Sequence, residues 1–169
     1  MGIANVTKIN LFIPPTLIAR SAGTWTAGIS SNVVSEARSA ADASFGLYIP
    51  IHLPSSEAYR QGAYLESVDV YYKIATAAAD DFATVELEKV SLPANGAAVS
   101  GSAVAASCGS AHDTAAERKA LGDHSLTVTL DQAVWIDDGD CYWLYLLVDA
   151  AATTVFTLFG ARANFDLRI

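Results

Sequence analysis

Apolar and polar residues alternate with a period of two over several short stretches, which is the pattern of a strand with one buried face. The clearest stretch runs from Ser67 to Ala75, with Val68, Val70, Tyr72 and Ile74 on one side. The stretch from Phe82 to Val90 repeats the pattern, but Val90 falls out of step, which predicts a bulge. We expect the two stretches to pair as a β-hairpin with a long loop.

The stretch from Cys141 to Asp149 differs because neither of its sides is polar, and it holds Tyr142, Trp143 and Tyr145. Such a run predicts a central strand with one side against a second sheet and the other against a subunit or loop. Tyr71, in contrast, is an aromatic residue on the polar side of its strand. We therefore expect Tyr71, Tyr142, Trp143 and Tyr145 to form an interface outside the domain core, with Tyr71 as the first candidate. Core packing is the alternative, and the one favoured for Trp143.

Further extended stretches cover residues 9–13, 45–53, 126–130, 155–160 and 164–169. Pro50 has no amide proton, so its strand should lie at a sheet edge or be interrupted there. Residues 35–44 and 111–121 have helical propensity but no broad apolar stripe, which favours short surface helices or loops. Asp113 or Thr114 could cap the second of these segments.

Several short strands joined by Gly, Ala and Ser loops are typical of an all-β fold. We expect residues 1–169 to form a single antiparallel β-sandwich domain, with a jelly roll as one form it could take. Residues 96–110 are rich in Ala, Ser and Gly and should form an exposed, mobile connection.

Composition narrows the classes of partner. The apolar fraction is 52% and only 17% of residues are charged, which is few for a free monomer and favours a homo-oligomer with buried interfaces. A net charge of −8 disfavours binding to nucleic acid or to an anionic membrane surface. The chain begins without a secretory signal pattern, so we expect synthesis in a cytoplasm, where Cys108 and Cys141 would be free thiols.

Two clusters carry candidate chemistry. Asp137, Asp138 and Asp140 surround Gly139 and could hold Ca²⁺, but the spacing is not that of an EF-hand, so an ordinary turn is favoured and no cofactor is expected. Residues 107–112 place Cys108 and Ser110 near His112, the residue types of a hydrolase. They lie in a loop without the strand–turn–helix elbow of such enzymes, so we expect no catalytic site.

Three segments together carry a resemblance to a group of proteins. They are Gly23-Thr24-Trp25-Thr26, the stretch from Ser67 to Ile74, and the stretch from Val148 to Phe156. In their pattern of strands and loops they resemble proteins of bacteriophage and environmental viral genomes that look like virion components. The resemblance implies a small β-sandwich that forms oligomers on, or decorates, a virus particle, with no functional residues to carry over.

The leading hypothesis is therefore a non-enzymatic virion protein, such as a capsid decoration or related assembly component, that acts through subunit packing. Its partners would be copies of itself and other virion proteins, and its location the virion. The alternative is a carbohydrate- or receptor-binding β-sandwich module, in which exposed aromatic residues and an acidic loop hold a glycan.

Overall fold

The computed structural model describes residues 6–30, 33–52, 63–93, 95–136 and 140–168. The strands are β1 (Val6–Ile13), β2 (Ala19–Arg20), β3 (Trp25–Ser30), β4 (Val33–Arg38), β5 (Ala43–Ile51), β6 (Ala63–Ala75), β7 (Asp81–Ser91), β8 (Ser100–Val104), β9 (Ala106–Cys108), β10 (Gly122–Ile136), β11 (Asp140–Ala150) and β12 (Val155–Arg168). The helices are a 3-10 turn, η1 (Pro15–Leu17), and the short α1 (Ala115–Arg118). The described part of the chain contains no helix long and apolar enough to cross a membrane.

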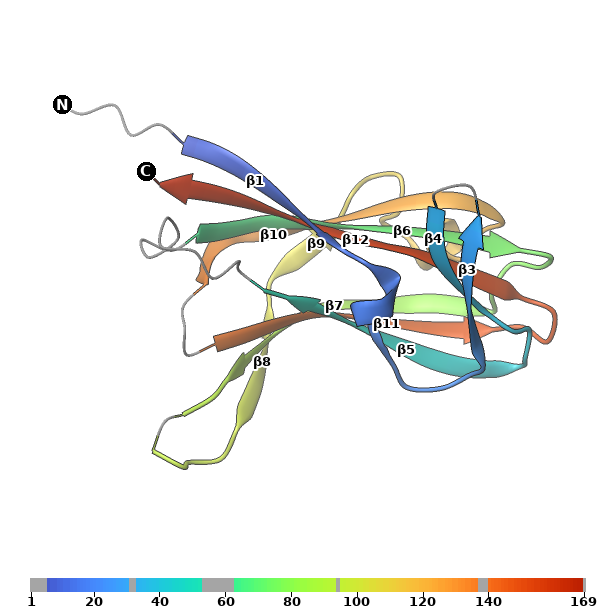
Figure 1. The fold of residues 1–169 in the computed structure, drawn as a ribbon, viewed down its shortest axis with the longest axis horizontal. Helices are drawn as coiled ribbons and strands as arrows, with labels where there is room; N and C mark the ends of the chain where they lie inside the picture. Colours follow the sequence, from blue (N-terminus) through green and yellow to red (C-terminus); the bar gives the residue numbers. More distant parts are fainter. Residues whose placement is uncertain (1–5, 31–32, 53–62, 94, 137–139, 169) are drawn as a thin grey trace.

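The strands form two stacked sheets, one above the other in Figure 1. The seven-stranded sheet, which we call sheet A, has the order β3-β4-β12-β6-β10-β9, with β1 also paired to β12. The five-stranded sheet, sheet B, has the order β2-β5-β11-β7-β8. Both are antiparallel, which confirms the predicted antiparallel β-sandwich.

The connectivity is that of a jelly roll. Among β4, β5, β6, β7, β8, β10, β11 and β12, the first strand pairs with the last, β5 with β11, β6 with β10, and β7 with β8. This nesting is what a long folded-over ribbon of antiparallel strands produces when it is wrapped into two sheets. Consecutive strands such as β10, β11 and β12 therefore alternate between sheets A and B.

The core lies between the sheets and consists of the inward side of each alternating strand. In β6, Val68, Val70, Tyr72 and Ile74 are buried as the period of two predicts. In β11, the inward residues are Tyr142, Leu144, Leu146 and Val148. Burial of these apolar side chains is the main stabilising contribution to the fold.

The prediction that β6 and β7 pair as a hairpin is wrong. Sheet A holds β6 between β12 and β10, whereas β7 lies in sheet B between β11 and β8. An alternating pattern shows which side of a strand is buried, but two strands that face each other across a core have the same pattern as two neighbours in one sheet. The bulge expected at Val90 is absent too, because the pairing of β7 with β11 runs unshifted from Ser91 to Thr84 and Val90 lies on the outer side with Glu88.

The segments between the expected strands also differ from prediction. Residues 35–44, expected as a short surface helix or a loop, contain no helix: they run from the end of β4, which pairs with β3 and β12, through a loop at 39–42 into β5. Arg38 is buried and donates to the carbonyl oxygens of Ala41 and Ala43. The second segment does contain α1, which Thr114 begins with a capping box to Glu117. Residues 96–110, expected as an exposed, mobile connection, are mostly exposed but contain β8 and β9.

The prediction for Pro50 is confirmed. In the described part of the chain, β2 covers β5 only at Tyr48 and Leu47, so Pro50 lies on an open edge of sheet B and pairs only with Trp143 of β11.

Candidate functional site

A groove of about 530 Å³ runs over the outer face of sheet B. One row of paired residues crosses the sheet from Ala19 through Tyr48 and Tyr145 to Glu86. These residues line the groove together with Trp143, Glu88 and Val90. The row thus begins with a small side chain on β2, continues with one aromatic ring on β5 and one on β11, and ends with a carboxylate on β7.

Tyr48 and Tyr145 form the floor of the groove. Their rings are stacked, with centroids 4.9 Å apart and planes inclined by 27°. Gly46 makes this arrangement possible, because a Cβ atom there would lie 2.9 Å from Cε2 of Tyr145. The absence of a side chain lets the Tyr145 ring lie over β5 instead of standing out into solvent. Burial raises the pKa of the Tyr145 hydroxyl, and the neighbouring Tyr48 raises it further, so it remains a hydrogen-bond donor at neutral pH.

Trp143 extends the aromatic surface along β11, two residues from Tyr145 and therefore on the same side of the strand. It pairs with Glu88 on β7, just as Tyr145 pairs with Glu86. The groove therefore has one aromatic line along β11 and a parallel line of carboxylates along β7. Aromatic rings offer flat apolar surface, and ionised carboxylates only accept hydrogen bonds, so the groove suits a ligand with apolar faces and many hydroxyl donors.

The four aromatic residues expected at an interface lie in three places. Trp143 and Tyr145 line the groove. Tyr142 points the other way and is 3% exposed, with its hydroxyl toward the carbonyl oxygen of Trp135 at 3.4 Å, so the structure places it in the core and not at a contact surface. Tyr71 is half-buried on the outer face of sheet A, where the guanidinium of Arg162 lies 5.8 Å from its ring centroid.

The acidic loop lies partly outside the described residues, which exclude Asp137 and Asp138. Asp140 accepts a hydrogen bond from Ser91 at 2.8 Å and forms an ion pair with Lys89 at 2.6 Å. The Lys89 and Ser91 contacts lower the pKa of Asp140. In the described part of the chain, no group of three or more His, Cys, Asp or Glu side chains is arranged to hold a metal ion.

The residues of the candidate hydrolase site make other contacts. His112 Nε2 lies 3.1 Å from His124 Nδ1, and His124 Nε2 lies 2.9 Å from the carbonyl oxygen of Ala120. Since a carbonyl only accepts, His124 donates from Nε2, and in the neutral form of His124 the Nδ1 atom therefore accepts from His112 Nε2. Burial raises the pKa of the Cys108 thiol, which keeps it protonated. The structure thus pairs the imidazole of His112 with that of His124 on β10.

Sequence reasoning expected Trp143 and Tyr145 at an interface and did not connect them with Tyr48 or the two carboxylates, which line the same groove. Glu86 and Glu88 were visible only as the polar side of a strand, and Tyr48 lies in a stretch with no polar alternation. Only the pairing of β5 and β7 with β11 brings these three residues to the groove. That pairing depends on contacts between residues far apart in the chain, so it cannot be predicted from a local sequence pattern.

Comparisons with known proteins leave the function open. No protein-family model matches the chain, and no curated protein matches it. Among solved structures, it is similar to the carbohydrate-binding module TmCBM61 in complex with β-1,4-galactotriose, with a TM-score of 0.35, 11% identity, and coverage of 96% of this chain and 88% of that one. It is also similar to a family 11 carbohydrate-binding module from Clostridium thermocellum in complex with a β-1,3-1,4-mixed-linked tetrasaccharide, with a TM-score of 0.33, 8% identity, and coverage of 96% and 89%. Likenesses of this degree carry no functional argument.

Proposed function

We propose that this protein binds a neutral carbohydrate in the groove on the outer face of sheet B. The observation that carries the proposal is the group of aromatic rings of Tyr48, Tyr145 and Trp143. They lie beside the carboxylates of Glu86 and Glu88. Sugar rings have apolar C–H faces that pack on aromatic rings, and their hydroxyl groups donate to carboxylates. Anionic sugars would be repelled by Glu86, Glu88 and the net charge of −8.

The test is a binding panel of soluble polysaccharides in native affinity gels. We expect a neutral polysaccharide (mixed-linkage β-glucan, galactan or mannan) to retard the protein, and polygalacturonate to have no effect. Calorimetry with oligosaccharides of the retarding polymer then gives the affinity of the groove. Absence of retardation by all the neutral polymers contradicts the proposal.

Variants assign the binding to the groove. Trp143→Ala and Tyr145→Ala should each weaken the affinity by about thirtyfold, since loss of a central aromatic contact costs about 2 kcal/mol. Leu147→Ala is the matched control, because Leu147 follows on the same side of β11 and is not among the lining residues. Unchanged affinity in Trp143→Ala, with the fold intact by circular dichroism, contradicts a binding role for the groove.

A second function, assembly into a larger particle, is favoured by a different observation. Ile29, Val33 and Val34 project from the hairpin of β3 and β4 at one end of sheet A, and Ile29 is 82% exposed. Apolar side chains gathered on one exposed hairpin are typical of a protein contact. We propose this hairpin as the self-association surface of a virion component, the setting that the sequence pattern favours.

Light scattering tests the assembly proposal. Wild-type protein should form an oligomer that Ile29→Asp with Val33→Asp converts to a monomer, whereas Val99→Asp, at an exposed apolar residue elsewhere, should leave it unchanged. A wild-type protein that stays monomeric at high concentration contradicts self-association.

A further inference from the structure

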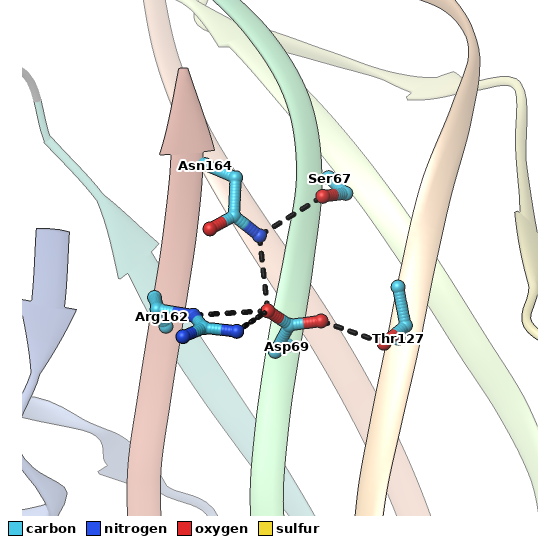
Figure 2. A network of polar contacts seen from close by, with 5 residues as sticks. All are labelled: Ser67, Asp69, Thr127, Arg162 and Asn164. Carbon is cyan, nitrogen blue, oxygen red and sulfur yellow. Dashed lines mark hydrogen bonds and ion pairs between the residues drawn. The ribbon is translucent and has the colours of Figure 1, made fainter. Parts of the chain in front are cut away.

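The outer face of sheet A, opposite the groove, carries a polar network around Asp69 (Figure 2). Asp69 Oδ1 accepts from the Thr127 hydroxyl at 2.6 Å. Its Oδ2 accepts from Arg162 Nε at 3.1 Å and Nη2 at 2.8 Å, and from Asn164 Nδ2 at 3.0 Å. Asn164 Nδ2 also donates to the Ser67 hydroxyl at 2.9 Å. The network thus joins three neighbouring strands, β10, β6 and β12.

The network fixes its side chains before any ligand arrives. Asp69 is only 5% exposed although it lies on the outer side of β6. Burial by itself would raise the pKa of Asp69, but the hydrogen bonds from Thr127, Asn164 and Arg162 together lower it, so the carboxylate is ionised at neutral pH. Its charge is balanced by Arg162, which leaves the centre of this face rigid and without net charge. Rigid, balanced polar groups reduce the cost of ordering on binding.

Polar groups continue from this centre in regular rows across the sheet. On β10 the outward residues Ser125, Thr127 and Thr129 are hydroxyl-bearing and pair with outward residues of β6. Those of β6 pair in turn with β12. The rows are Thr129–Ser67–Asn164, Thr127–Asp69–Arg162 and Ser125–Tyr71–Gly160. Hydroxyl and amide groups both donate and accept, which matches the hydroxyl groups of a sugar chain.

Aromatic rings close one end of these rows. Tyr71 pairs with Gly160 of β12, and Phe12 lies against the same glycine from the other side. A Cβ at Gly160 would be 3.0 Å from Cε2 and Cζ of Phe12, and the φ of +121° at this position also favours glycine. The ring of Phe12 is held against the backbone in this way, and yet the residue is 64% exposed.

A second aromatic pair closes the other end. Tyr64 and Trp135 face each other across β6 and β10, with ring centroids 4.8 Å apart, and Trp135 is 39% exposed. From Tyr64 to Tyr71 the strand advances roughly 23 Å, at about 3.3 Å per residue. A role in joining strands explains Asp69, but it does not explain exposed rings at both ends of a polar track.

We propose that the outer face of sheet A is a second binding face, for a neutral polysaccharide chain lying along β6 and β12 between the two aromatic pairs. Tyr71, Phe12 and Arg162 contact the chain, and Asp69 is a positioning residue that orients Arg162. The two sheets are stacked, so their outer faces point in opposite directions and one molecule can bridge two polysaccharide chains. The inference rests on sheet A alone and does not need the groove to bind.

The test uses a protein whose groove has been removed by Trp143→Ala with Tyr145→Ala. In native affinity gels with the same neutral polysaccharides, we expect this double variant to remain retarded, more weakly than wild type. Adding Tyr71→Ala and Phe12→Ala should abolish the residual retardation, while adding Leu147→Ala should not. The inference is overturned if the double variant is not retarded, or if retardation survives loss of Tyr71 and Phe12.

The outcomes separate the two proposals. Loss of all binding in the groove variant supports the groove and rejects the second face. Undiminished retardation of the groove variant, followed by its loss when Tyr71→Ala and Phe12→Ala are added, supports the second face and rejects the groove. Asp69→Asn should weaken retardation of the groove-deficient protein about tenfold or more, while the groove affinity of the otherwise wild-type protein stays within about twofold. An equal loss at both faces would reduce Asp69 to a general structural role.

Discussion

The outer faces of the two sheets use carboxylates in different ways. In sheet B, Glu86 and Glu88 lie beside aromatic rings and line an open groove. In sheet A, the Asp69 carboxylate is buried under the residues that it binds, Arg162 and Asn164 among them. The outer face of sheet B thus has carboxylates that a ligand could contact directly. On the outer face of sheet A, the Asp69 carboxylate instead holds the neighbouring side chains in position.

This difference between the two faces predicts that a substitution can alter binding and the stability of the fold together on sheet A, but not on sheet B. Glu86 and Glu88 line the groove on the outer side of β7, so changing them should cost the fold little. Asp69 is bonded to groups on two neighbouring strands, so a change there reaches both β10 and β12. A ligand on sheet A would therefore bind to a surface that also holds the sheet together.

The largest expected effect comes from exchanging the carboxylates for amides. Asp69→Asn should lower the free energy of unfolding by about 1–3 kcal/mol, because an amide cannot accept all the donors that face the carboxylate. Glu88→Gln should change it by less than about 0.5 kcal/mol, as surface substitutions usually do. Urea denaturation of both variants measures the difference, and equal losses would contradict the contrast between the faces.

A smaller effect is expected from adding a methyl group beneath the groove. Gly46→Ala brings a Cβ to 2.9 Å from Cε2 of Tyr145, so the ring must shift and lose part of its stacking on Tyr48. We expect the groove affinity to fall by about threefold to tenfold, in line with roughly 1 kcal/mol for an aromatic pair. Gly101→Ala in the same sheet is the control, since its Cβ would lie 3.7 Å from Glu88 Oε2, an ordinary van der Waals distance that requires no shift of this groove residue. Equal affinities in the two variants would show that the Tyr145 position is not needed.

The smallest expected effect is a dependence on pH that does not distinguish the two faces. His112 and His124 lie at the end of the sandwich, near Arg118, which donates to the carbonyl oxygens of Phe82, Ala83, His112 and Asp113. Burial lowers the pKa of His112, and the His124 imidazole lowers it further, against an opposing effect of Glu117.

A base whose folded-state pKa is depressed stabilises the fold above its unfolded pKa, about 6.5 for histidine, and this contribution is lost as pH falls through the folded value. The melting temperature should therefore fall below about pH 6.5, and less steeply in His112→Asn. A melting profile with the same slope in both proteins would contradict this assignment.

The sequence predicted the buried sides of the strands well and their neighbours poorly. The alternation through Val68, Val70 and Tyr72 follows from a local period and needs no knowledge of the partner strand. The pairing of β6 with β10 and β12 depends on long-range contacts, so a hairpin with the next strand was the natural but incorrect expectation.

The candidate site was predictable only in part for the same reason. A run with no polar side, such as residues 141–149, indicates that both sides are covered or used, but not which side faces inward. The structure sends Tyr142 into the core and Trp143 and Tyr145 outward. Tyr48 joins them only because β5 pairs in register with β11. On sheet A, Asp69 and Arg162 are 93 residues apart, and nothing local links them.

The most direct test of groove binding follows the indole N–H signals of the three tryptophans by NMR during titration with a neutral oligosaccharide. Trp143 lines the groove, Trp135 lies on sheet A, and Trp25 is an internal reference whose Nε1 donates to the carbonyl oxygen of Ala22. We predict a saturable shift of the Trp143 signal with Trp25 unchanged. A titration in which the oligosaccharide binds while the Trp143 signal stays in place would contradict the account.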